Sequence, residues 1–340
     1  QYYAGQPPEV HANMTAKNLG DQIVLGLIGM LVQGKFFMIF SFLFGLSFYI
    51  QLAKSDGSSR FVLHFAWRLI VLFLIGMLHH LHYRGDILII YAALGFVLLL
   101  VYKLPDKALL VLGLMLVANI PSLGVRLYEA IMGTTNNMFN ADQKELLTYY
   151  DTVKSGSYLS ILKANLYDFV TKFEFQVFSG RIYITTGLFL LGLFVGRKKF
   201  FEHWVEQAPF IKRLLKASLW TILGCVLFSI AFFGGAQAAK LELSQSLQYA
   251  IGGLVFDFFN ACLATFYITG ILLLYRNEKC QKRLMAFYAM GRMGLTTYLM
   301  QSFFGVLIFF SIGLGWLGDY GSAICLSMGL VVFVIQVYFS

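Results

Sequence analysis

The stretch LIVLFLIGML, which runs from Leu69 to Leu78, decides the fold of this chain. It presents apolar side chains in every direction, whether it is drawn as a helix or as a strand. Strands of an outer-membrane barrel alternate apolar and polar residues, so this stretch does not fit one. A helix surrounded by lipid is apolar all round and satisfies its backbone polar groups internally. The stretch therefore predicts an all-α protein, a polytopic bundle of transmembrane helices.

The composition of the whole chain agrees with this prediction. Of its 340 residues, 59% are hydrophobic and only 13% are charged, against roughly 25% charged residues in soluble domains. A soluble enzyme, a disordered protein and a nucleic-acid-binding module all need more polar surface than this chain provides. The net charge of +9 fits basic loops on the cytoplasmic side of a membrane. We therefore expect membrane lipid, and no nucleic acid, as a partner.

A membrane-spanning helix needs about 20 apolar residues because it rises about 1.5 Å per residue across roughly 30 Å of hydrocarbon. About nine segments approach this requirement: 36–52, 62–80, 87–102, 107–123, 180–196, 214–235, 250–275, 291–312 and 320–339. Loops rich in Lys and Arg remain in the cytoplasm. This rule places 197–213 and 276–290 inside and orients every other loop by alternation.

The span count divides the chain into four parts: 1–35, 36–123, 124–179 and 180–340. They are predicted to be an extracytoplasmic segment with a short interfacial helix in Asp21–Gln33, a four-helix membrane part, an extracytoplasmic loop and a five-helix membrane domain. Within the loop, apolar residues at helical spacing follow Ser157, a residue type that caps helix N-termini. We expect the stretch from Ser157 to Lys172 to form an amphipathic helix lying flat at the outer interface.

Polar side chains in or beside the spans are candidates for function, because it is costly to bury them in lipid. The candidates at or below the predicted outer ends of the helices are Lys35, His79, His80, His82, Arg84, Asp86, Arg181, Asp257 and Asn260, with Gln301 near the middle of its span. If these helices bundle together, we expect the side chains to converge on one cavity that opens outward.

His79 and Asp86 are the predicted catalytic residues. Histidine changes its charge near neutral pH, so His79 could take a proton from an acceptor hydroxyl as a general base. Asp86 could orient and stabilise the imidazole. The alternative is an ordinary polar turn in which Asp86 caps the next helix. His82 could join them in holding a metal, but the turn between these residues breaks the helix, and we predict no metal site.

Asp257 lies in an apolar run, and a buried carboxylate there needs a partner, for which Arg181 or Lys35 would serve. The predicted substrate-binding residues are Lys35, Arg181, Asp257, Asn260 and Gln301. On the inner side, Arg68 and Arg292 could contact an anion such as a nucleotide-bearing cofactor. Topology alone also places basic residues there, so this assignment has a purely structural alternative.

Four stretches carry a resemblance to a known family. They are GKFFMIFSFLFGLSF (Gly34 to Phe48), RLIVLFLIGMLHH (Arg68 to His80), GDILIIYAALGFVLL (Gly85 to Leu99) and GRMGLTTYLMQS (Gly291 to Ser302). Together they resemble the YeiB family, whose members carry domain of unknown function 418. The resemblance implies a multi-pass protein of the bacterial inner membrane. Family members usually begin with one further span, so we expect this chain to lack the first of about ten.

The architecture of that family is similar to that of integral-membrane acyltransferases, which carry an acyl group from a cytosolic thioester to an acceptor on the far side. The resemblance therefore implies acyl transfer, with acyl-CoA as donor and a hydroxyl of a glycan or lipid as acceptor. The matching stretches hold or adjoin Lys35, His79, Asp86, Arg292 and Gln301. A basic group, Lys35 or Arg181, is expected to stabilise the oxyanion.

Two other functions stay open. A transporter or lipid translocase would use Asp257 and His79 to carry protons or to bind cargo. A non-catalytic membrane partner would use neither residue. An inverted repeat between the two halves would favour transport, and the sequence shows none. A homodimer is an open expectation for the oligomeric state.

Overall fold

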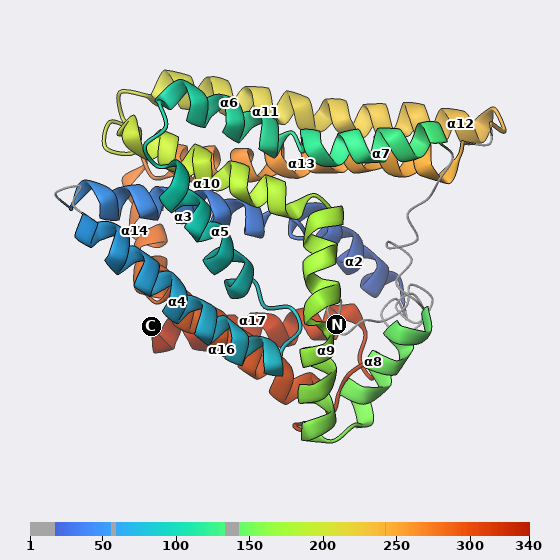
Figure 1. The fold of residues 1–340 in the computed structure, drawn as a ribbon. Coiled ribbons are helices and arrows are strands. Elements are labelled where there is room, and N and C mark those ends of the chain that lie inside the picture. Colours follow the sequence, from blue (N-terminus) through green and yellow to red (C-terminus); the bar gives the residue numbers. More distant parts are fainter. Residues whose placement is uncertain (1–17, 56–58, 133–142, 242) are drawn as a thin grey trace.

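The computed structural model describes residues 18–340 except 56–58, 133–142 and 242 (Figure 1). Regular structure within these residues is entirely helical, which confirms the predicted all-α class. The helices are α2 (Leu19–Leu31), α3 (Phe36–Ala53), α4 (Ser59–His82), α5 (Leu88–Val101), α6 (Asp106–Val117), α7 (Ile120–Met132), α8 (Gln143–Ser155), α9 (Tyr158–Phe178), α10 (Arg181–Arg197), α11 (Ala208–Ser229), α12 (Gly235–Ala238), α13 (Gln245–Leu274), α14 (Glu278–Leu284), α15 (Tyr288–Arg292), α16 (Gly294–Phe309) and α17 (Ser322–Phe339).

Within the described residues, six helical segments are long and apolar enough to cross a membrane: Leu19–Ala53, Arg60–His82, Asp106–Met132, Ala208–Ala238, Gln245–Leu274 and Ser322–Phe339. A seventh is α9 with α10, if this pair, bent by 66°, is one span. The predicted count of about nine is therefore not exact. α5 and α16 have 14 and 16 residues, fewer than the roughly 20 that a crossing needs.

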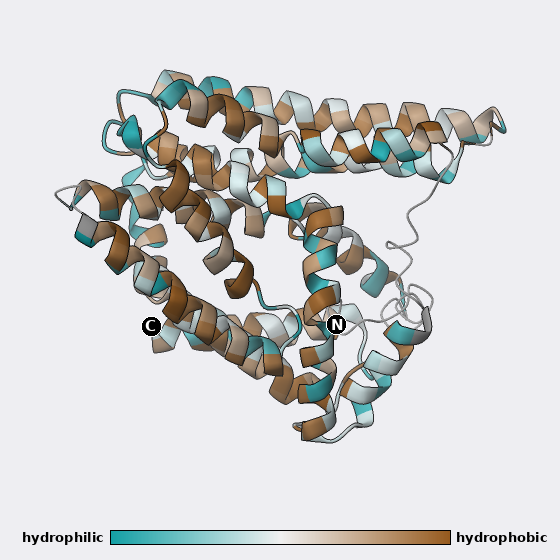
Figure 2. Ribbon diagram, viewed as in Figure 1, coloured by the Kyte–Doolittle hydropathy of each residue, from teal (hydrophilic) through white to brown (hydrophobic). Residues whose placement is uncertain are grey.

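Hydrophobic positions occur along most of the helices (Figure 2), and many large apolar side chains are exposed. Leu63 on α4, Trp220 on α11 and Tyr338 on α17 expose 72%, 70% and 89% of their surface. Such surface is unfavourable in water and suits the interior of a bilayer. The chain is therefore a helical protein of the membrane type, and its place in the bacterial inner membrane remains a prediction.

The largest core lies where α10 runs along α3 and α6. Glycines bring α3 and α10 close together, because a side-chain carbon on Gly192 would collide with the backbone of Phe42. Phe48 and Phe189 are wholly buried in this core, which also takes residues from α4 and α5. The core therefore fixes α4 relative to α5, and the turn between them carries the candidate site.

A second core joins the α8–α9 hairpin to the end of α16 and the segment after it. α9 begins after Ser157, whose hydroxyl accepts a hydrogen bond from the Ser160 amide at 3.3 Å. A helix follows Ser157 as predicted, and α2 is a helix over most of Asp21–Gln33. α2 is, however, continuous with α3 in one candidate span, and α9 belongs to the bent pair with α10, so their position at the outer interface remains a prediction. α9 packs across α4, so the hairpin lies beside the turn that follows α4 (Figure 1).

Candidate functional site

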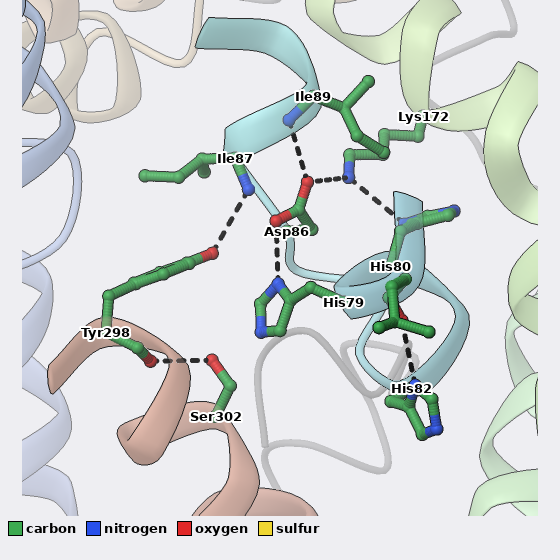
Figure 3. Close-up of polar contacts among 10 residues, drawn as sticks. His79, His80, His82, Asp86, Ile87, Ile89, Lys172, Tyr298 and Ser302 are labelled. Carbon is green, nitrogen blue, oxygen red and sulfur yellow. Dashed lines mark hydrogen bonds and ion pairs between the residues drawn. The ribbon is translucent and has the colours of Figure 1, made fainter. Parts of the chain in front are cut away.

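His79 and Asp86 face each other across the turn between α4 and α5 (Figure 3). The distance from His79 Nδ1 to Asp86 Oδ1 is 2.7 Å, and the side chains are only 8% and 0% exposed. Because a carboxylate only accepts hydrogen bonds, His79 Nδ1 is the donor. In the neutral imidazole the lone pair is then on Nε2.

The second oxygen of Asp86 has two partners. The amide of Ile89, in the first turn of α5, donates to Asp86 Oδ2 at 3.1 Å. The ammonium group of Lys172, on α9, lies 3.7 Å from the same oxygen. Asp86 therefore binds the first turn of the next helix, as the structural alternative predicted, and also holds the imidazole of His79.

His79 Nε2 is buried and has no hydrogen-bond partner among the described residues. The ring lies between two tyrosines, with centroids 5.6 Å from that of Tyr83 and 5.2 Å from that of Tyr298. The Tyr298 hydroxyl accepts a hydrogen bond from the Ile87 amide at 3.2 Å, which ties α16 to the same turn. A ligand that reached this point would meet a basic nitrogen already oriented by a carboxylate.

The other two histidines of the turn have separate partners. His80 Nδ1 accepts a hydrogen bond from Lys172 Nζ at 3.2 Å, and His80 is 1% exposed. His82 Nε2 lies 2.7 Å from the Tyr158 hydroxyl at the start of α9. Both histidines therefore connect α4 to α9, and neither bonds directly to His79 or Asp86, although Lys172 contacts both His80 and Asp86.

A salt bridge also joins the α8–α9 hairpin to the turn after α4. Arg84 lies 2.6 Å from Asp168 on α9 and stands over the ring of Tyr149 on α8. The Tyr149 hydroxyl donates to Asn165 Oδ1 at 2.7 Å, and Asn165 Nδ2 donates to the Leu81 carbonyl at 2.9 Å. Burial raises the pKa of Tyr149 well above its ordinary value, so it remains a donor at neutral pH.

The predicted partners of Asp257 were wrong. Its carboxylate accepts a hydrogen bond from Asn119 Nδ2 at 2.8 Å and pairs with Arg126 at 3.3 Å, both outside the predicted set. Lys35 instead donates to the carbonyl of Gly29, near the end of α2, and to that of Gln33, in the turn before α3. Arg181 acts on Asp257 only as a neighbouring charge.

The remaining predicted residues lie in three places. Asn260 is one turn along α13 from Asp257 and is 1% exposed. Gln301 on α16 donates to Gln336 of α17 at 3.0 Å. Arg68 donates to Gln51, and Arg292 lies over the ring of Tyr288, both at exposed positions.

The described hydrogen bonds and ion pairs do not unite these candidates in one cluster. They join His79 to Asp86, and a second set gathers around α13, with Asp257 and Asn260. Their hydrogen bonds and ion pairs thus form two polar clusters, and the convergence of all candidates on one outward cavity remains a prediction. Sequence reasoning missed Lys172 and Arg126. Each is a basic residue among apolar neighbours, and this pattern could have identified both as candidate partners of buried carboxylates.

Comparison with known proteins finds a family match over the carboxyl-terminal part of the chain and relatives without a described function. Residues 195–340 match a family model described as "Protein of unknown function (DUF418)". The chain is 28% identical over 321 residues to the uncharacterized protein YxaH of Bacillus subtilis (strain 168), covering 91% of this chain and 75% of that protein. It is 33% identical over 99 residues to an uncharacterized 39.9 kDa protein in the amylase 3' region of Bacillus acidopullulyticus, which is 28% of each chain. No solved structure matches the chain. The match of residues 195–340 to the DUF418 model, and the similarity to YxaH over most of the chain, agree with the predicted resemblance to YeiB proteins.

Proposed function

We propose that this chain is an integral-membrane acyltransferase in which His79 is the general base. The observation that carries the proposal is the contact of 2.7 Å between His79 Nδ1 and Asp86, combined with a buried Nε2 that has no partner among the described residues. A histidine held by a carboxylate on one nitrogen and free on the other is the usual arrangement for activating a hydroxyl nucleophile.

The proposed reaction is transfer of an acyl group from a thioester to a hydroxyl. The acceptor hydroxyl gives its proton to His79 Nε2 while its oxygen attacks the thioester carbonyl carbon. Asp86 stabilises the imidazolium that forms. The carbon–sulfur bond then breaks, and the leaving thiolate takes the proton from His79, which gives an ester and a free thiol. The oxyanion role expected of Lys35 or Arg181 is not part of this proposal, because their contacts lie in the other cluster.

The position of Arg68 supports a donor that enters from the cytoplasmic side. Arg68 and His79 are 11 positions apart on α4, which is about three turns, so they lie on nearly the same face, about 16 Å apart along the axis. An extended pantetheine arm can cover that separation. In this proposal Arg68 holds a phosphate of the donor, and Arg292, exposed on α15, is a second contact for it.

Proteoliposomes supplied with radiolabelled acetyl-CoA and a bacterial lipid or glycan extract test the proposal. We expect label to enter the extract and thiol to be released in equal amount. His79→Gln should lower the rate by about 100-fold or more, the usual contribution of a general base, and Asp86→Asn should also lower it. His64→Gln is the matched control, because His64 is an exposed histidine on the same helix. Equal rates for His79→Gln and His64→Gln would contradict the proposal.

A second candidate function is transport, which the buried pair of Asp257 and Arg126 favours. Both side chains are at most 13% exposed, and ionisable groups at such positions often line a substrate or proton path. Proton-coupled uptake into vesicles, lost in Asp257→Asn and retained in His79→Gln, would establish this function in place of acyl transfer.

A further inference from the structure

Three helical segments are interrupted at one place in the fold. α2 gives way to α3 near Gly34, α6 to α7 at Asn119, and α9 to α10 at Gly180. All three residues have positive φ values, of 84°, 54° and 77°. Gly180 lies against the amide of Asn119, and Gly34 lies against the amide of Asn260 on α13. The three breaks therefore meet beside one segment of α13.

The carbonyl groups freed at two of these breaks are already paired. Lys35 is wholly buried, and its ammonium donates to the carbonyls of Gly29 at 2.9 Å and Gln33 at 2.6 Å. Arg126 donates to the carbonyl of Ser179 at 3.1 Å while its other nitrogen contacts Asp257. These cations satisfy the carboxyl ends of α2 and α9, which would otherwise lack partners.

The amino ends of the next helices are not satisfied in this way. The N-cap residues of α3 and α10 give no side-chain hydrogen bond, although the first amide of α10 donates to Ser179 Oγ at 3.4 Å. A helix amino end carries a partial positive charge. Arg181 opens α10 with its guanidinium over the rings of Phe37 and Phe175, at 5.4 Å and 5.0 Å. No acidic group pairs with it among the described residues. The local charge is therefore positive, with Asp257 as its acidic member, and it favours an anion.

Acceptor atoms at the same place also lack partners. Asn119 Oδ1, Ser122 Oγ and Asn260 Oδ1 are buried with no hydrogen bond in the part of the chain that the structure describes. Their residues are only 1%, 4% and 1% exposed. Buried polar atoms are almost always hydrogen-bonded, so these three oxygens are available to bind the hydroxyl groups of a ligand.

We infer that the three breaks form a binding site for a hydroxylated phosphate of the glycerophosphate class. The amino ends of α3 and α10, with Arg181, receive the phosphate, and the oxygens of Asn119 and Asn260 accept from the hydroxyls. The site is separate from His79 and Asp86 and does not depend on acyl transfer. A free metabolite and the headgroup of an anionic lipid share this chemistry.

The test uses the purified chain in nanodiscs of phosphatidylcholine. sn-Glycerol 3-phosphate is titrated while thermal unfolding is followed, with glycerol and inorganic phosphate as separate probes. A second set of nanodiscs contains phosphatidylglycerol. Arg181→Gln and Asn260→Leu each remove one half of the site. Arg213→Gln is the control, because Arg213 is exposed on α11 far along the chain from the breaks.

We expect sn-glycerol 3-phosphate to raise the unfolding temperature more than either probe alone, with binding about 10- to 100-fold weaker in Arg181→Gln, the loss of one charged hydrogen bond. Stabilisation by phosphatidylglycerol alone, lost in the same variants, supports the site with a lipid as its occupant. If neither phosphate-bearing probe stabilises the wild type, or if Arg181→Gln responds like Arg213→Gln, the inference is wrong. Should Arg181→Gln fail to fold, Asn260→Leu decides in the same way.

Discussion

Replacing Lys172 with methionine keeps most of the side-chain length and removes the charge beside Asp86. The ammonium lies 3.7 Å from Asp86 Oδ2, and the two side chains are 9% and 0% exposed. The attraction at that distance is about 4 kcal/mol for an effective dielectric constant of about 20, and desolvation of both groups offsets part of it. Removing one partner of a buried pair typically costs about 3–5 kcal/mol, because the other charge stays buried. We expect Lys172→Met to lower the free energy of unfolding by about 3 kcal/mol.

The measurement is unfolding by SDS in mixed micelles, with helix content as the signal. Lys163→Met is the control, because Lys163 is an exposed lysine on the same helix and should change stability little. A double-mutant cycle with Asp86→Asn isolates the pair, and we expect a coupling of about 1–3 kcal/mol. Strict additivity of the two substitutions, or an equal effect of Lys163→Met, would refute the reasoning, since the cost would then not arise from Asp86.

Three further predictions concern stability. Gly192→Ala should lower the free energy of unfolding by about 1–3 kcal/mol, because it overpacks α10 against the backbone of α3. Gly224→Ala is the control in the same SDS titration and should not lower it, because Gly224 has open space around it. Gln336→Leu should lower stability by about 1 kcal/mol, because the wholly buried Gln336 amide donates to the Thr297 carbonyl at 3.0 Å; an unchanged unfolding curve would show that this bond contributes nothing. Tyr149→Phe should weaken the loss of stability at alkaline pH. Burial raises the folded-state pKa of Tyr149. Its contribution to the free energy of unfolding is therefore fully present below the ordinary tyrosine pKa of about 10 and is lost as the pH rises above it. Identical profiles of stability against pH for wild type and variant would contradict this.

The fold class and the central contact of the site could be predicted because both are local. The stretch from Leu69 to Leu78 is apolar on every face, which only a helix in lipid explains. His79 and Asp86 are seven residues apart with one turn between them, so the chain itself brings them together. No knowledge of how the helices are arranged was needed for either prediction.

The partners of Asp257 could not be predicted in the same way. Arg126 and Asn119 are more than 130 residues away in the chain, and their contact with Asp257 depends on α7 packing against α13. Sequence offered Lys35 and Arg181 as equally basic alternatives, and nothing local distinguishes them. The predicted number of membrane spans exceeded the number in the structure for a related reason. α5 and α16 are apolar enough to resemble spans, but their length is set by where the tertiary structure ends them.

The neighbouring histidines at the end of α4 illustrate how rotation along a helix assigns different tasks to identical side chains. Successive residues point about 100° apart, so His79 faces Asp86 while His80 faces Lys172. Deleting one residue of α4 ahead of them would move His80 into the helical position of His79 and Leu81 into that of His80, so Lys172 would lose its imidazole partner. The number of residues between the buried core residues of α4, such as Leu69, and His79 therefore fixes which histidine meets Asp86.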